Sequence, residues 1–162
     1  MVAVHVTLLC VGKLGEDYLR AAQAEYIKRL RPYARVEVLE LKEEPLPPPH
    51  QREAVERALA REGEAILRRL PRESYVVALD RAGKMLSSEE LASFWQELLR
   101  RGTGRVCFVI GGSAGLSPEV IRSADFCLSL SRLTFPHQLA RIILLEQLYR
   151  ACKIASGEPY HR

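Results

Sequence analysis

Three short segments of the sequence carry glycine, hydroxyl and charged residues with which backbone and side chains could bind a small ligand. The segments are Leu79–Lys84, Gly111–Gly115 and Ser129–His137. Each begins at the end of an apolar run that we predict to be a buried strand. Ligands of parallel α/β sheets bind beyond the carboxyl ends of the strands. We therefore expect a ligand site where these three segments meet.

The glycine spacing argues against two common nucleotide sites. Gly111-Gly112-x-x-Gly115 differs from the GxGxxG pattern of dinucleotide-binding folds, and no lysine follows it as in a P-loop. Glycine has no Cβ, so a ligand can approach this turn closely. A glycine-rich turn that serves only tight packing is the alternative interpretation.

Two histidines are the candidates for acid–base chemistry, because the sequence has neither a GxSxG nor an HExxH motif. His137 follows Pro136 at a predicted helix start, and His161 is the penultimate residue, between a tyrosine and an arginine. In that tail, Tyr160 could stack on a flipped-out base while His161 assists proton removal and Arg162 binds phosphate. Chain ends are often dispensable, so a tail that only aids solubility is the alternative.

The charge distribution favours a phosphate-rich partner. The net charge is +4, and from Ser131 onward five basic residues face two acidic ones. A basic region of this kind suits nucleic acid. A solvated face that happens to be basic is the alternative.

Strands alternate with helices along the whole chain. Three of the predicted strands, 4–11, 75–79 and 105–110, are apolar without alternation, as expected when helices cover both faces of a sheet. We predict a single domain, residues 1–162, with a three-layer α/β fold and a mostly parallel, five- to six-stranded sheet. The other expected elements are strands over 36–41 and 126–130, and helices over 16–30, 51–70, from Ser87, 117–124 and from His137 to about Gly157.

The last predicted helix is apolar at nearly every angle between His137 and Ile154. A helix that is apolar all round must be buried all round. One side can pack on the sheet, and we expect the other side to pack on a second copy, giving a homodimer. A helix sunk within a monomer is the alternative.

Several classes of protein are not favoured. The four cysteines have no CxxC spacing and lie in apolar segments, so we expect reduced, buried thiols and no metal site. The start of the chain lacks the basic segment and cleavage site of a signal peptide. The longest uncharged apolar stretch, Val106–Leu116, is far short of the ~20 residues of a membrane span. We expect a cytoplasmic protein that does not enter a membrane.

Three motifs in order closely resemble the RlmH family of SPOUT-class methyltransferases. They are Phe108–Ser117, Leu130–His137 and the terminal Pro159–Arg162. The resemblance extends over the whole chain, including Val11-Gly12-Lys13, and is strongest after Leu79. Members of this family methylate N3 of a pseudouridine in the 23S rRNA hairpin that faces the decoding region of the ribosome.

The resemblance implies a fold and a cofactor that composition alone does not. It implies a C-terminal trefoil knot within about residues 75–162, and a homodimer acting on 23S rRNA or the ribosome. It also implies that S-adenosyl-L-methionine is bound in the knot, mainly by backbone groups. The matching positions are Leu79, Gly111, Leu130, Ser131, Arg132, Leu133, Thr134 and Phe135.

The same resemblance leads to hypotheses for the remaining site residues. The methyl donor is already activated, so catalysis can consist mostly of positioning, but the target N3–H must lose its proton. We expect His161 to accept this proton or to position a water, with His137 as the second candidate. Four residues are expected to contact RNA: Arg141, Arg150, Tyr160 and Arg162. A non-catalytic RNA- or ribosome-binding module, and a SPOUT enzyme that acts on tRNA, are the alternatives.

Overall fold

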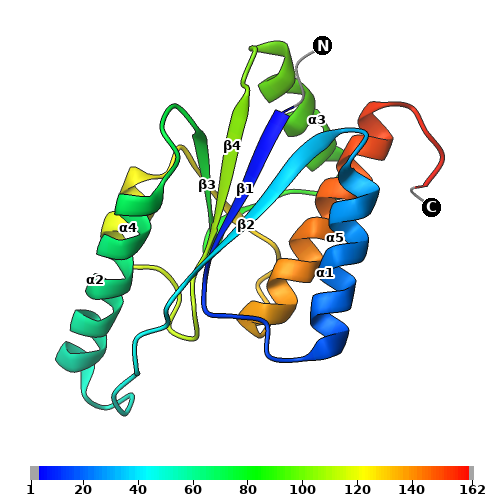
Figure 1. Cartoon of the computed structure of the whole chain (residues 1–162). Coiled ribbons are helices and arrows are strands. Elements are labelled where there is room, and N and C mark those ends of the chain that lie inside the picture. Colours follow the sequence, from blue (N-terminus) through cyan, green and yellow to red (C-terminus); the bar gives the residue numbers. More distant parts are fainter. Residues whose placement is uncertain (1–3, 161–162) are drawn as a thin grey trace.

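Five parallel strands form the centre of the molecule, in the order β2-β1-β4-β3-β5 (Figure 1). The structure is a computed structural model, and it describes residues 4–160. The sheet has the lower of the two predicted strand numbers, and all of its pairs are parallel. The strands are β1 Val4–Val11, β2 Ala34–Leu41, β3 Tyr75–Met85, β4 Arg105–Ile110 and β5 Phe126–Ser129.

Helices cover both faces of this sheet, so the predicted three layers are confirmed (Figure 1). The side chains of α1, α3 and α5 share one core with the sheet, and those of α2 and α4 share a second core on the opposite face. The helices are α1 Asp17–Leu30, α2 Arg52–Arg69, α3 Ser88–Arg100, α4 Pro118–Ser123 and α5 His137–Ala155. None of these helices is long and apolar enough to cross a membrane.

Two helix starts follow the local sequence signals. Ser87 and Glu90, which have the spacing of a capping box, form one at the start of α3, where each side chain accepts a hydrogen bond from the backbone of the other residue. Ser117 caps α4, and Pro118 occupies its first turn. These signals are short-range, so the sequence alone locates them.

The third strand is longer than the predicted 75–79, because β3 continues past an irregularity after Leu79. Pairing with β5 resumes at Lys84 and continues at Met85. Between these two pairings the chain bulges out and carries the polar residues that follow Leu79. Gly83 makes the return possible, since a Cβ there would lie 2.6 Å from the carbonyl oxygen of Cys127.

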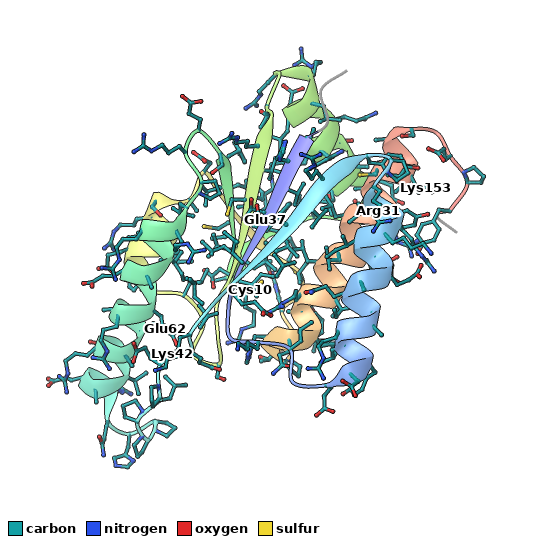
Figure 2. All side chains as sticks on the ribbon, viewed as in Figure 1. Cys10, Arg31, Glu37, Lys42, Glu62 and Lys153 are labelled. Carbon is teal, nitrogen blue, oxygen red and sulfur yellow. The ribbon has the colours of Figure 1, made fainter. Side chains whose placement is uncertain are left out.

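The cysteines are unpaired, as predicted, and Cys10, Cys107 and Cys152 are buried. Cys10 lies at the centre of the molecule (Figure 2). Burial raises the pKa of the Cys10 thiol to about 11, although the nearby Arg141 guanidinium acts in the opposite direction. Burial also raises the pKa of Cys107 and Cys152, each to about 12. These thiols therefore stay protonated and behave as small apolar side chains.

Helix α5 buries one face rather than its whole circumference within this chain. The buried positions recur with helical spacing, whereas Leu139 is 42% exposed and Ile142, Ile143 and Ile154 are half-buried. One chain thus leaves an apolar strip of α5 partly open. The buried positions are Arg141, Leu144, Leu145, Leu148, Ala151 and Cys152.

Arg141 lies inside the protein, which corrects the expectation that it binds RNA. Its side chain is 1% exposed and forms an ion pair with Glu40 at 2.6 Å. The guanidinium also donates to Gln23 Oε1 at 3.1 Å and to the carbonyl oxygen of Gly12 at 3.2 Å. An arginine enclosed in this way cannot reach a phosphate, so the prediction for Arg141 is wrong.

Replacing Arg141 with alanine is expected to destabilise the fold by about 3 kcal/mol, because Glu40 and the Gly12 carbonyl lose their buried partner. Urea unfolding at fixed protein concentration measures this change. The control is Arg122→Ala, since Arg122 pairs with Glu119 at an exposed site and should cost no more than about 1 kcal/mol. Equal losses for the two variants would contradict this role for the buried pair.

Candidate functional site

A pocket of about 400 Å³ opens at the carboxyl ends of β3, β4 and β5. The three segments singled out in the sequence meet there, as predicted from the parallel sheet. The volume lies in the range of small-molecule sites. The residues that line the pocket are Leu79, Asp80, Arg81, Ala82, Ile110, Gly111, Gly112, Ser113, Ala114, Gly115, Leu116, Leu128, Leu130, Ser131, Leu133, Thr134, Phe135, His137 and Ala140.

Most of the residues predicted to hold a cofactor line this pocket. Arg132 is the exception, because its side chain is exposed and is not part of the lining. His137, the second candidate for acid–base chemistry, lies in the wall at the start of α5. That these residues hold a cofactor stays a prediction. The predicted cofactor residues that do line the pocket are Leu79, Gly111, Leu130, Ser131, Leu133, Thr134 and Phe135.

The glycine turn after β4 forms one wall and closes tightly on itself. Gly112 and Gly115 form a bridge in which the Gly115 amide donates to the Gly112 carbonyl oxygen at 3.0 Å. Gly115 has φ +81°, a conformation that favours glycine. A Cβ on Gly111 would lie only 2.4 Å from the Gly115 carbonyl oxygen. The glycines are therefore required by the shape of the turn itself, which supports the packing interpretation, and the close approach of a ligand to this turn stays a prediction.

Hydroxyl groups hold the opposite wall, which is the turn after β5. Ser129 Oγ donates to the Ser131 carbonyl oxygen at 3.0 Å, and the Leu133 amide donates to Ser131 Oγ at 3.0 Å. Arg81, in the bulge of β3, donates a hydrogen bond to Thr134 Oγ1. Asp80 is the only acidic side chain among the lining residues, and its Oδ1 accepts from the Ala82 amide at 3.4 Å.

Glu43 supports the glycine turn from outside the pocket lining, and the sequence analysis did not single it out. Its Oε1 accepts hydrogen bonds from the backbone amide and the hydroxyl of Ser113, at 3.3 and 3.1 Å. The same carboxylate lies against Gly112, where a Cβ would be 2.9 Å from Oε1. Glu43 belongs to the proline-containing loop after β2, 70 residues from Ser113, and no local pattern links the two.

The start of α5 is tied to the loop between β1 and α1. Gln138 Oε1 accepts from the Gly15 amide at 2.8 Å, and Arg141 donates to the Gly12 carbonyl oxygen. His137 Nε2 also lies close to Gly12, at 3.5 Å from the position of a Cβ there. The loop of the N-terminal strand therefore positions a wall of the pocket.

Arg150 and Tyr160 lie together near the other end of α5. Arg150 pairs with Glu146 at 2.7 Å, and its guanidinium lies 4.8 Å from the centroid of the Tyr160 ring. The Tyr160 hydroxyl donates to Glu146 at 3.0 Å. Burial, and then this hydrogen bond, raise the pKa of Tyr160. The two remaining tail candidates, His161 and Arg162, lie outside the described residues.

This cluster is separate from the pocket within one chain. Arg150 follows His137 by 13 positions on α5, which corresponds to about 20 Å of helix. Neither Arg150 nor Tyr160 lines the pocket. Among residues 4–160, no group of three or more His, Cys, Asp or Glu side chains is arranged to hold a metal ion.

The fold and pocket define a class of α/β protein with a pocket at the carboxyl edge of a parallel sheet. A family model described as "Predicted SPOUT methyltransferase" matches residues 4–161. Two solved structures share the fold at low identity. A probable methyltransferase from Bordetella pertussis Tohama I has a TM-score of 0.55 at 18% identity, covering 91% of this chain and 96% of its own. A probable methylase family protein from Haemophilus influenzae Rd KW20 has a TM-score of 0.51 at 13% identity, covering 98% of this chain and 70% of its own.

Relatives of much higher identity narrow the class. "Ribosomal RNA large subunit methyltransferase H" of Moorella thermoacetica is 54% identical over 159 residues, covering 98% of this chain and 99% of the relative. The protein of the same name from Carboxydothermus hydrogenoformans is 50% identical, covering 98% of this chain and all of the relative. This chain belongs to the RlmH family of SPOUT methyltransferases.

Replacing Gly111 with alanine is expected to destabilise the fold by about 1 to 3 kcal/mol, because the new Cβ must displace the Gly115 carbonyl. Gly104→Ala is the matched control, since nothing lies within 4 Å of a Cβ at that position. Thermal and urea unfolding of both variants measure the difference. A Gly111→Ala protein as stable as the control would contradict the close contact.

Proposed function

We propose that this protein transfers a methyl group from S-adenosyl-L-methionine to N3 of a pseudouridine in 23S rRNA of the large ribosomal subunit. The observation that carries the proposal is the identity of 54% over nearly the whole chain to a methyltransferase named for large-subunit ribosomal RNA. The pocket supports it, since two of the three family motifs, Phe108–Ser117 and Leu130–His137, contribute residues to one continuous site. We also propose that the protein works in the cytoplasm, where ribosomes are found.

The pocket has features that suit S-adenosyl-L-methionine. Its walls consist mostly of apolar side chains and backbone. At Gly111 the backbone itself forms the wall, because a Cβ there would meet the Gly115 carbonyl. Asp80 is available for the amino group of the methionine part, and the turn after β5 offers backbone groups to the adenine. When bound, the sulfonium supplies an activated methyl group. The residues of the chain then have to hold the acceptor in line and take up its proton.

The proton of N3 needs an acceptor close to the pocket. His137 is in the wall, near Gly12, and belongs to the same chain as the pocket. His161 follows Tyr160, whose ring packs near the far end of α5. We therefore propose that His161 of one copy acts at the pocket of the second copy. Packing of the two α5 helices against each other would bring that pocket within reach of His161.

A homodimer is part of this proposal. The strip of α5 that one chain leaves half-open, including the 42% exposed Leu139, would be covered by the partner. The partner's Arg150, Tyr160 and Arg162 would then contact the RNA around the bound nucleotide. Glu146 already neutralises the charge of Arg150. Arg150 would therefore contribute a directed hydrogen bond to the RNA, and little net positive charge.

The C-terminal trefoil knot that the family resemblance implies, within about residues 75–162, also belongs to the proposal. The match of the SPOUT family model to residues 4–161 supports it. Knotted chains are rare exceptions among proteins. Single-molecule pulling on both termini tests the knot, since a knotted chain extends less than its full contour length.

Two measurements test the proposed function. Titration calorimetry should show saturable binding of S-adenosyl-L-methionine, whereas a non-catalytic RNA-binding module predicts none. The protein is then incubated separately with whole ribosomes, large subunits, bare 23S rRNA and tRNA. Methylation is expected in one or more of the samples that contain 23S rRNA and not in tRNA. Methylation of tRNA in place of rRNA would favour the second alternative and contradict the proposed substrate.

Replacing His161 with alanine is expected to lower the turnover by about a hundredfold or more, because a general base contributes about this much. The affinity for S-adenosyl-L-methionine should stay nearly unchanged. The matched variant is His137→Ala, which tests the second candidate at the pocket wall. Unchanged turnover in His161→Ala would remove the proposed role of that residue.

A mixing experiment locates His161 relative to the pocket. His161→Ala protomers and Asp80→Ala protomers are each expected to be nearly inactive alone, and Asp80→Ala avoids the backbone clash that destabilises Gly111→Ala. In a co-expressed mixed dimer the His161→Ala protomer supplies an intact pocket, and its partner supplies an intact tail that faces this pocket. Recovered activity in the mixture supports a tail that acts on the partner, and its absence would contradict it.

A further inference from the structure

We propose that Arg81 and Arg132 form a phosphate-binding rim at the mouth of the pocket, which holds the RNA backbone beside the nucleotide that is methylated. This inference rests on the proposed function, because it takes the acceptor to be RNA. The rim belongs to the same chain as the pocket, whereas the proposed tail contacts come from the second copy.

Arg81 is the only lysine or arginine among the residues that line the pocket. It follows Asp80 where β3 bulges, and its side chain is exposed. The two other ionisable groups of the lining are Asp80 and His137. A ligand that enters this pocket therefore meets one permanent positive charge at the entrance.

The partner of Arg81 leaves that charge unneutralised. Its guanidinium donates to the hydroxyl of Thr134, which is neutral. Arg122, by comparison, pairs with Glu119 at 3.2 Å, and Arg100 pairs with Glu97 at 2.7 Å. A hydroxyl fixes the direction of the guanidinium without competing with an anion. Charge-assisted bonds to phosphate are stronger than a bond to a hydroxyl, so phosphate can replace or extend this contact.

Arg132 presents a second positive charge on the neighbouring wall. Its side chain is exposed, and within residues 4–160 it has no hydrogen bond or ion pair. It lies two positions before Thr134, the partner of Arg81, in the turn held by the Ser131 hydroxyl. Arg81 is bonded to the turn that contains Arg132, so the two arginines belong to one rim of the pocket. The side chain of Arg132 is exposed and is not part of the lining.

The charge of the methyl donor favours phosphate as the partner of this rim. S-adenosyl-L-methionine carries a sulfonium, an ammonium and a carboxylate, so it is a cation. A fixed guanidinium close to it would oppose its binding, whereas the same group at a solvent-exposed mouth is screened from it. RNA brings one negative charge per nucleotide, and the planar guanidinium suits two phosphate oxygens at once.

The test compares Arg81→Gln, Arg132→Gln and the double variant with Arg122→Gln as the control. Arg122 lies on α4, outside the pocket lining, so its loss should not affect RNA binding there. The probe is an RNA hairpin with the sequence of the rRNA target, bound at several salt concentrations. Each rim variant is expected to weaken hairpin binding by about tenfold at low salt. The slope of log K against log salt should fall by about one per lost contact.

The same variants are titrated with S-adenosyl-L-methionine, and their affinity should stay within about twofold of the parent. A large loss of donor affinity in Arg81→Gln would assign this arginine to the donor and overturn the proposal. An unchanged salt slope in both single variants and in the double variant would also overturn it. Because hairpin binding is measured without methyl transfer, failure of the rim and failure of the proposed reaction are separate results.

Discussion

The buried guanidinium of Arg141 is the interaction on which the geometry of the site depends. It joins α5 to the end of β1 through the Gly12 carbonyl and to β2 through Glu40. Among residues 4–160, its Nε is also the one buried side-chain polar atom without a hydrogen-bond partner. Such a group is costly to bury, so it stays in place only because its other contacts are good. Arg141 lies one helical turn after His137, so its contacts also fix the position of the first turn of α5.

The interior of the pocket and its mouth differ in charge. Its interior is made of glycine backbone, apolar side chains and hydroxyl-fixed turns, while Glu43 braces the glycine turn from behind. Permanent positive charge is confined to the mouth, at Arg81, with Arg132 just outside. This arrangement suits the proposed cationic donor inside, where Asp80 is the one acidic lining residue, and a polyanionic acceptor at the mouth, where the arginines are exposed.

The length of α5 separates the pocket from the Arg150–Tyr160 cluster within one chain. The pocket lies at the first turn of this helix, and the Arg150–Tyr160 cluster lies about 20 Å further along it. A rigid helix cannot bring its own two ends together. Within one chain Arg150 and Tyr160 therefore lie apart from the pocket, and in the proposed homodimer the half-open apolar strip of α5 is the surface available for contact with a second copy.

Local patterns in the sequence determined the order of strands and helices, the caps at Ser87 and Ser117, and the three segments that surround the pocket. These features depend on neighbours a few residues apart, so periodicity and turn chemistry are sufficient. Only the tertiary structure decided that Arg141 is buried, that Arg132 lies outside the pocket and that Glu43 reaches Ser113. Whether an arginine meets water, phosphate or a carboxylate depends on which distant segments the fold packs against it, and no spacing along the chain encodes that.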